Sequence, residues 1–248
     1  MTVPGRSPGT EPAPAARPVP GPRPRTGPLL AVAAVCALLF VAAAVTVSVH
    51  HGAPFAPERV AVRWSVARHG EPALSLARAL TDTGTGLIPY LAAVLGGLLA
   101  GRGTCGRIRA VACAVAVLAV GQAIRFGLMR LLTRPRPPVT DWAQYASGYA
   151  FPSGHATTAV LAAGILAWGI ARRARPAVAG TWCAVLAVWA AGVGLTRVYL
   201  GVHWPVDVLA GWFLAAALLA LALLLEPYAV PRRTRCPDPP PPAIPMNS

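Results

Sequence analysis

The run PLLAVAAVCALLFVAAAVTVS, residues 28–48, decides the fold class of this chain. About 20 consecutive apolar residues make a helix long enough to cross a hydrocarbon core of roughly 30 Å. A cleaved secretory signal has a shorter apolar region and a small-residue cleavage site, and the 27 residues that precede this run are long for a signal leader. We therefore predict an uncleaved transmembrane helix.

Further apolar runs follow this first one, separated by Arg, Gly or Pro. They cover residues 87–101, 108–132, 157–171, 178–196 and 205–225. Two of them are short and must extend into their flanks to cross a bilayer. We predict an all-α polytopic membrane protein, a six-transmembrane-helix bundle spanning residues 28–226. The Pro-rich segments 1–27 and 227–248 are predicted to be disordered tails, because they carry too little apolar surface to form a core.

The composition of the 248 residues agrees with a membrane protein. Hydrophobic residues make up 55%, mean hydropathy is +0.55, and only 12% of residues are charged, against about 25% in soluble domains. The 22 basic residues, all arginine, outnumber 8 acidic ones but lie scattered between apolar runs, so they do not predict nucleic-acid binding. The five cysteines form no CxxC or Cys–His pattern, so we expect no structural disulfide and no zinc site.

The arginines also predict an orientation. A six-span topology places 13 of them on the side of both tails and 8 on the other side, and positive residues favour the cytoplasm. We therefore expect a multi-pass protein of the plasma membrane with both tails cytoplasmic. The longest outer connection, residues 50–86, fits short interfacial helices or a solvated loop equally well.

Polar residues gather in three clusters on the predicted outer side. Ionisable groups near apolar spans are costly, so they mark functional sites by default. Each cluster alone could be a membrane flank or a helix cap, but together they bring two histidines, an intramembrane acid and at least two arginines to one face of the bundle. We therefore predict one active site at the outer membrane–water interface, built from residues 130–137 (RLLTRPRP), 151–155 (FPSGH) and 196–207 (TRVYLGVHWPVD).

These residue types suit phosphoryl transfer. Arg136 and Arg197 can each grip phosphate oxygens with a planar fork of donors. Ser153 and Gly154 open a helix, where free backbone N–H groups and the helix dipole attract an anion. Such a cradle stabilises the charge that the transition state places on the phosphoryl oxygens. We expect no metal site and no cofactor.

The histidines have distinct expected roles. His203 and Asp207 are four residues apart, and Pro205 favours a first helical turn that places them on one face. The carboxylate can then hold one imidazole nitrogen and raise the basicity of the other, which makes His203 the nucleophile. His155, at the helix entry, is expected to protonate the leaving group and later to activate water.

Taken in order, RPRP, PSGH and R-x5-H-x3-D resemble the three-part signature of the type 2 phosphatidic acid phosphatase superfamily, which includes membrane lipid phosphatases and is related to vanadium haloperoxidases. The resemblance covers roughly residues 28–226. It implies a six-span phosphatase with a phosphohistidine intermediate on His203, acid–base catalysis by His155 and no metal requirement. The implied substrate is a lipid phosphomonoester or diphosphate, phosphatidic acid-like or polyprenyl.

The sequence departs from this pattern at two positions. The family's first motif opens with Lys where Met129 stands here, so Arg130 beside it or Arg125 a turn earlier would have to supply the charge. Arg130 and Arg134 are both kept as possible phosphate ligands. Thr196 replaces a Ser of the third motif and keeps its hydroxyl group.

Several alternatives remain open on the sequence. A lipid phosphotransferase could use the same site, and a catalytically degenerate transport or binding protein is a second, weaker alternative. Loop 138–150 contains three aromatic residues, Trp142, Tyr145 and Tyr149. They either shape a pocket for the lipid headgroup or anchor the loop at the membrane interface. The oligomeric state and the physiological lipid are not predicted.

Overall fold

Membrane-spanning helices dominate the computed structural model, which describes residues 26–229. Five helices in that range are long and apolar enough to cross a bilayer, and a sixth crossing arises if a bent helix pair counts as one span. The all-α polytopic fold is thereby confirmed. The five are α1 (Thr26–Val49), α5 (Gly103–Leu132), α6 (Gly154–Ala171), α7 (Pro176–Tyr199) and α8 (Pro205–Ala229).

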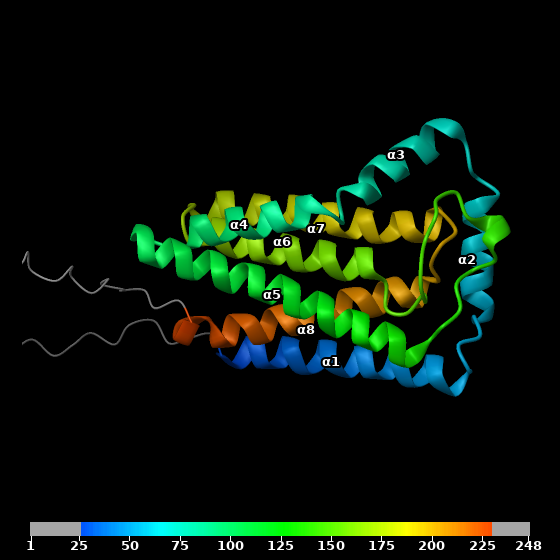
Figure 1. Cartoon of the computed structure of the whole chain (residues 1–248), viewed down its shortest axis with the longest axis horizontal. Helices are drawn as coiled ribbons and strands as arrows, with labels where there is room; N and C mark the ends of the chain where they lie inside the picture. The colour runs from blue at the N-terminus through cyan, green and yellow to red at the C-terminus, as the bar shows by residue number, and fades with distance from the viewer. Residues whose placement is uncertain (1–25, 230–248) are drawn as a thin grey trace, which may run out of the picture.

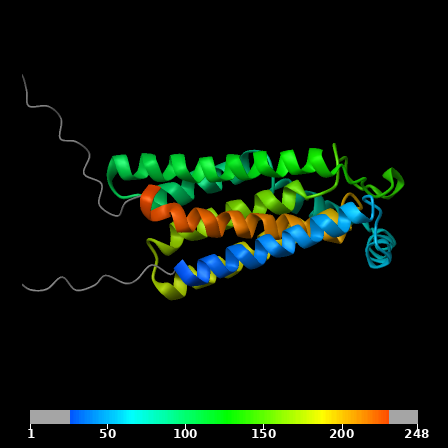
Figure 2. The ribbon, with the colours of Figure 1, turned by 90° about the horizontal axis from the view of Figure 1, so that it is seen from below.

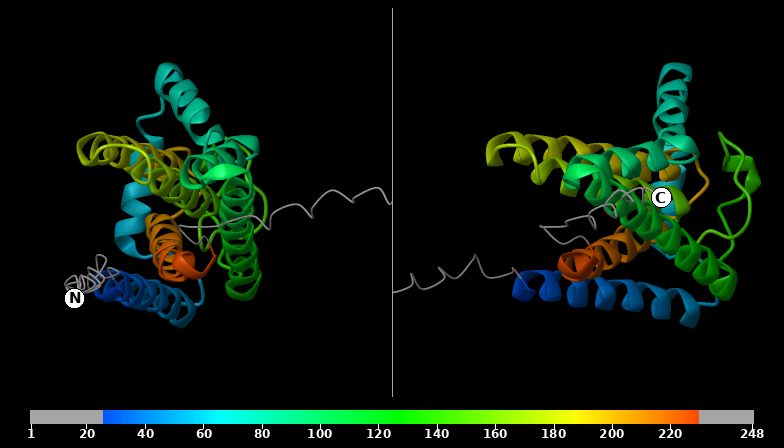
Figure 3. Two further views of the ribbon diagram at one scale, coloured as in Figure 1. Left: turned by 90° about the vertical axis from the view of Figure 1, so that its left-hand side faces the viewer. Right: turned by 60° about the vertical axis from the view of Figure 1, so that its left-hand side comes forward.

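The bent pair consists of α3 (Glu71–Asp82) and α4 (Leu87–Ala100), which meet at 49°. Two glycines explain the break. Gly86 has a φ of +66°, a conformation that side chains disfavour, and a Cβ on Gly84 would meet Val193 Cγ1 at 2.3 Å. The short predicted span 87–101 therefore gains its length from a separate helix that leans away from the bundle (Figure 3).

The helices pack around α6, which contacts α4, α5, α7 and α8, while α1 lies along α8 (Figures 1 and 2). Small residues allow the closest approaches, as is common between membrane helices. A Cβ on Gly169 would lie 2.2 Å from the Gly96 carbonyl oxygen. Large apolar side chains such as Leu38 and Val188 remain exposed on the outer surfaces, where lipid would surround them.

Both ends of the described chain lie at the same end of the bundle (Figure 1). The opposite end carries α2 (Ala56–Val66), the 3-10 helix η1 (Val139–Asp141) and the loop of residues 133–153. Of the two alternatives left open for residues 50–86, the structure has short helices, α2 and α3. The predicted tails fall outside the described residues, except for Thr26–Gly27 and residues 227–229, which belong to α1 and α8.

The cysteine prediction is wrong at one position. Cys105 is disulfide-bonded, whereas Cys36, Cys113 and Cys183 are free. Cys105 lies in the first turn of α5, at a helix end next to the connecting loop, and not inside an apolar run like the other three. Its position at a helix end makes it accessible to a disulfide partner.

Candidate active site

A cavity of about 430 Å³ opens at the end of the bundle that carries loop 133–153. Its size is in the range of small-molecule sites. Five residues predicted for the site line it, and they come from the loop, from α6, from α7 and from the α7–α8 connection: Arg136, Gly154, His155, Arg197 and His203. The convergence expected from the three sequence clusters is therefore present.

Arg136 links the loop to the α7–α8 connection by hydrogen bonds. Its Nε donates to the Gly148 carbonyl at 3.0 Å and its Nη2 to the Ser147 carbonyl at 2.8 Å. Its Nη1 donates to the Val202 carbonyl at 2.8 Å and contacts His203 Nε2 at 2.9 Å. Burial lowers the pKa of Arg136 to about 10, so the guanidinium stays protonated at neutral pH. One N–H of Nη2 remains for a ligand.

These contacts define the state of His203. A guanidinium can only donate, so His203 Nε2 must accept, and the ring proton then resides on Nδ1. Burial, together with the charges of Arg136 and Arg197, lowers the pKa of His203 well below 6.5. The imidazole is therefore neutral with its lone pair on Nε2, the form that a nucleophile requires.

Asp207 lies beside His203, but not in the arrangement expected. Helix α8 begins at Pro205 as predicted, so His203 precedes the helix. Asp207 Oδ2 accepts from the Trp204 N–H at 2.8 Å and lies 3.5 Å from His203 Nδ1. The carboxylate thus caps the start of α8 and faces the protonated nitrogen without a formed hydrogen bond to it.

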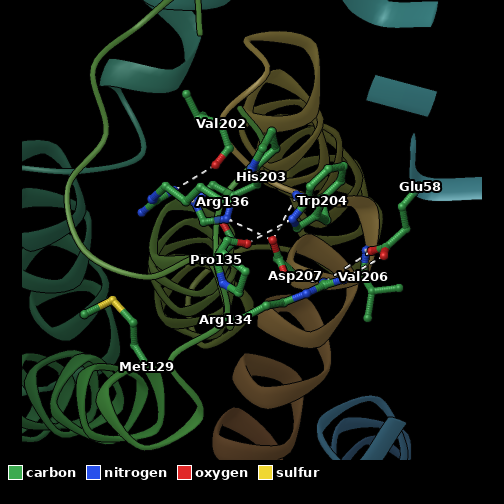
Figure 4. Close-up of polar contacts among 12 residues, drawn as sticks. Glu58, Met129, Arg134, Pro135, Arg136, Val202, His203, Trp204, Val206 and Asp207 are labelled. Atoms are coloured by element: carbon green, nitrogen blue, oxygen red, sulfur yellow. Dashed lines mark hydrogen bonds and ion pairs between the residues drawn. The ribbon is translucent and has the colours of Figure 1, made fainter. Parts of the chain in front are cut away.

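Arg134, one of the possible phosphate ligands, does not line the cavity. Its side chain is fully buried, and its guanidinium contacts two carboxylates (Figure 4). Nη2 donates to Glu58 Oε2 at 2.6 Å and Nη1 to Asp207 Oδ1 at 2.6 Å. Burial alone would lower the pKa of Arg134, but Asp207 and Glu58 outweigh it and raise the pKa. Two buried carboxylates require a cation at this position, and Arg134 provides it.

The start of α6 is the segment for which the sequence predicts an anion cradle. Ser153 occupies the N-cap position, yet its side chain makes no capping hydrogen bond. Its buried hydroxyl has no hydrogen-bond partner among residues 26–229. A Cβ on Gly154 would lie 3.1 Å from Arg125 Cζ, so glycine lets that guanidinium approach the helix terminus. The free N–H groups of the first turn add to this positive site.

Arg197 is held by residues that sequence reasoning missed. Its Nη1 donates to Thr81 Oγ1 at 3.0 Å and to Gln144 Oε1 at 2.9 Å. Gln144 in turn donates to Asp82 Oδ1 at 3.0 Å. The side chain of Arg197 is buried, and its Nε has no partner within the described part of the chain. Nothing in the local sequence of Thr81 or Gln144 distinguishes them from ordinary polar residues near a helix end or in a loop.

Unpartnered polar atoms concentrate around the cavity. Of the five buried side-chain N or O atoms without a hydrogen-bond partner in the described range, four belong to site residues: Arg125 Nε, Ser153 Oγ, Arg197 Nε and His203 Nδ1. Buried polar groups are normally paired, so each such group needs an explanation. Their chemistry points to a ligand with several acceptor oxygens. Among residues 26–229, no group of three or more His, Cys, Asp or Glu is placed to hold a metal ion.

Arg125 and Arg130, the two residues that could supply the charge of the motif lysine, occupy different positions in the structure. Arg125 lines the same cavity as His155 and His203, and its Nη1 contacts Met129 Sδ at 3.3 Å. Arg130 is exposed, with its Cζ 4.7 Å from the centre of the Phe126 ring, and lines a neighbouring cavity instead. Met129 is buried and lies apart from the Arg136–His203 cluster (Figure 4).

The aromatic residues of the loop differ from one another. Tyr145 lines the cavity that contains His155 and His203, although it is 83% exposed, and Tyr149 lines the neighbouring one. Trp142 donates to the Pro137 carbonyl at 2.9 Å and packs against a cluster that contains Leu74. Pocket lining thus fits the two tyrosines, and internal packing fits the tryptophan.

Comparison with known proteins gives a family match over the segment that holds the three motifs. The family model described as PAP2 superfamily matches residues 110–231. Phosphatidylglycerophosphatase B of Escherichia coli strain K12 is 42% identical over 86 residues, which are 33% of this chain and 31% of that protein. Undecaprenyl-diphosphatase of Sulfolobus acidocaldarius is 36% identical over 78 residues, 32% of this chain and 34% of that protein. The chain thus matches about a third of the length of these curated relatives.

A solved structure extends the match to nearly the whole fold. The crystal structure of the first transmembrane PAP2 type phosphatidylglycerolphosphate phosphatase from Bacillus subtilis has a TM-score of 0.68 and 21% sequence identity. The match covers 81% of this chain and 98% of that one. This similarity shows the same fold. The family match covers the segment that holds the three motifs, so the chain belongs to the PAP2 superfamily.

Proposed function

We propose that the protein is an integral membrane phosphatase that hydrolyses the phosphomonoester or diphosphate of a lipid through a phosphohistidine on His203. One observation carries this proposal. A neutral imidazole, with its lone pair on Nε2, borders a cavity that is lined by three arginines and surrounded by unpartnered buried donors. The named activities of the relatives support a phosphatidic acid-like or polyprenyl lipid as substrate.

The first half-reaction forms the phosphoenzyme. Phosphoryl oxygens bind between Arg197 Nε, Arg125 and the start of α6, where the Ser153 hydroxyl adds a donor. His203 Nε2 attacks phosphorus while the bond to the leaving oxygen breaks, and His155 donates a proton to that oxygen. The Arg136 Nη1 that contacts Nε2 at 2.9 Å can turn to a phosphoryl oxygen as the lone pair is used.

The second half-reaction releases phosphate. His155, now neutral, takes a proton from water, and the resulting hydroxide attacks phosphorus and displaces His203 Nε2. During the phosphoenzyme state the imidazole carries positive charge on its Nδ1–H side. Asp207 Oδ2, 3.5 Å from Nδ1, stabilises that charge without entering the covalent chemistry.

The proposed orientation places this site outside the cell and both tails in the cytoplasm. The two described chain ends lie at the end of the bundle opposite loop 133–153 (Figure 1). Arg102, Arg107, Arg172 and Arg173 are near that same end, in or beside the α4–α5 and α6–α7 connections. Their positive charge favours the cytoplasmic side for this end.

Hydrolysis by purified protein in chelator, over a panel of lipid phosphates and diphosphates, tests the proposal directly. We expect phosphate release from at least one lipid and none with His203→Ala. A lipid phosphotransferase would instead need an added alcohol acceptor and would produce a new phosphoester. Binding of lipid phosphates without release or transfer would favour the degenerate transport or binding protein and overturn the proposal.

A further inference from the structure

We propose that Glu58 is a positioning residue of this site, which acts through Arg134 on Asp207 and so on His203. The proposal rests on the phosphatase function proposed above. Glu58 belongs to α2, outside the three sequence clusters, and is only 3% exposed. A carboxylate buried to this degree needs several partners to be tolerated.

The carboxylate of Glu58 joins three separate segments of the chain. Its Oε2 accepts from the Phe55 N–H at 2.9 Å and from Arg134 Nη2 at 2.6 Å. Its Oε1 accepts from the Val206 N–H at 3.2 Å and from Arg134 Nη1 at 3.3 Å (Figure 4). Glu58 therefore holds the start of α2, the guanidinium before the Arg136 loop and the first turn of α8 in one arrangement.

Arg134 connects Glu58 to Asp207. Its Nη1 is shared between Glu58 Oε1 and Asp207 Oδ1, the latter at 2.6 Å. With Oδ1 held in this way, the other oxygen of Asp207 faces the Trp204 N–H and His203 Nδ1. The orientation of Asp207 toward the nucleophile thus depends on where Glu58 keeps the guanidinium.

The charges of the buried cluster also favour this role. Glu58, Arg134 and Asp207 together carry a net charge of one negative unit, all in side chains that are at most 4% exposed. His203 gains a positive charge when its Nε2 bonds to phosphorus, and the surplus carboxylate stabilises it. Buried ion clusters add little to folding stability compared with apolar packing. The position of this one beside the nucleophile therefore points to catalysis.

Glu58→Gln is the test variant, because glutamine keeps the shape but offers one acceptor oxygen and no charge. We expect kcat for a lipid phosphate to fall roughly ten- to thirty-fold, with KM within about twofold because Glu58 does not contact the phosphate cavity. Formation of labelled phosphoenzyme, followed by rapid quench, should slow by the same factor. Glu58→Asp, which keeps the charge on a shorter side chain, should recover part of kcat.

Glu226→Gln is the matched control. Glu226 pairs with Arg172, is partly buried, and lies at the opposite end of the bundle from the site. The same substitution there should leave kcat and KM unchanged. A purely structural role for Glu58 would lower the yield of folded protein and the thermal midpoint without a selective loss of kcat.

The possible outcomes separate the two proposals. A wild-type protein that forms no phosphoenzyme with any lipid phosphate overturns the phosphatase function and this inference with it. An active wild type with an unchanged kcat in Glu58→Gln overturns the role of Glu58 alone. Loss of folded protein in both Glu58→Gln and Glu58→Asp would also overturn it, because Glu58 would then serve stability.

Discussion

Replacing Arg125 by alanine should strongly lower kcat/KM for phosphate release, whereas replacing Arg130 by alanine should leave it nearly unchanged. The family's lysine position holds Met129, and Arg125 lies one helical turn before it on the same face of α5. Arg125 lines the catalytic cavity, rests against the Gly154 backbone and has a buried, unpartnered Nε. Arg130 lies outside the cavity with an exposed side chain.

The size of the effect follows from the contacts. A hydrogen bond to a charged group is worth about 1.5–3 kcal/mol, so the loss of one such bond to the phosphoryl group lowers kcat/KM by roughly ten- to a hundredfold. Arg125→Ala should fall in this range, and Arg125→Lys should keep more of the activity. Arg130→Ala should stay within about twofold, because substitutions at exposed positions usually cost less than about 0.5 kcal/mol.

The assay is phosphate release from the best lipid substrate by each purified variant, with kcat and KM determined separately. A second substitution that restores activity to Arg125→Ala provides a further test. Met129 Sδ contacts Arg125 Nη1 at 3.3 Å, so lysine at position 129 reaches the same region, and Met129→Lys should restore part of the activity of Arg125→Ala. Full activity of Arg125→Ala, or an equal loss in Arg130→Ala, would refute the reasoning.

A trapping experiment with labelled aryl phosphate, quenched in base, should distinguish the roles of the two histidines. Label should accumulate on His155→Ala, because its dephosphorylation is slow, and should be absent from His203→Ala. Label on the His203 variant would remove it as the nucleophile. A membrane-impermeant thiol reagent should label a cysteine at Ala146 but not one at Ser7, and the reverse would invert the topology. Because burial and nearby arginines lower the pKa of His203, the histidine stays neutral as pH falls through 6.5. The rate of phosphoenzyme formation, corrected for ionisation of the substrate, should therefore not fall as pH is lowered through 6.5, and such a fall would contradict a neutral nucleophile.

Much of this architecture could be predicted because lipid imposes simple rules. A span must be long and apolar, so the run at 28–48 and the later runs indicated the helices. Charged groups are costly beside such spans, so their clustering in three motifs predicted a common site. The motif residues also lie where helix chemistry favours them, with Ser153 before the first turn of α6 and Pro205 at the start of α8.

The remainder depended on contacts between distant residues. Arg134 and Arg136 are both arginines followed by proline, so no local pattern distinguishes the one that pairs with carboxylates from the one that faces the cavity. Glu58 precedes Arg134 by 76 residues and lies in a connection whose sequence fits short interfacial helices or a solvated loop equally well. The break between α3 and α4 arose from packing against Val193, which the glycines alone do not reveal.

The two arginines of the Arg-Pro-Arg-Pro segment have different electrostatic roles: Arg134 pairs with buried carboxylates, and Arg136 faces the cavity. The site must concentrate positive charge for a phosphate and also keep a carboxylate beside its nucleophile, and these opposite charges attract each other. Arg136 does experience the charge of Asp207, which acts to raise its pKa. Arg134 Nη1 donates to the far oxygen of Asp207, Oδ1, at 2.6 Å, and Arg134 Nη2 donates to Glu58 Oε2 at 2.6 Å, so Asp207 belongs to a separate buried cluster. Arg136 can therefore contact His203 Nε2 and the cavity instead of pairing with the acid.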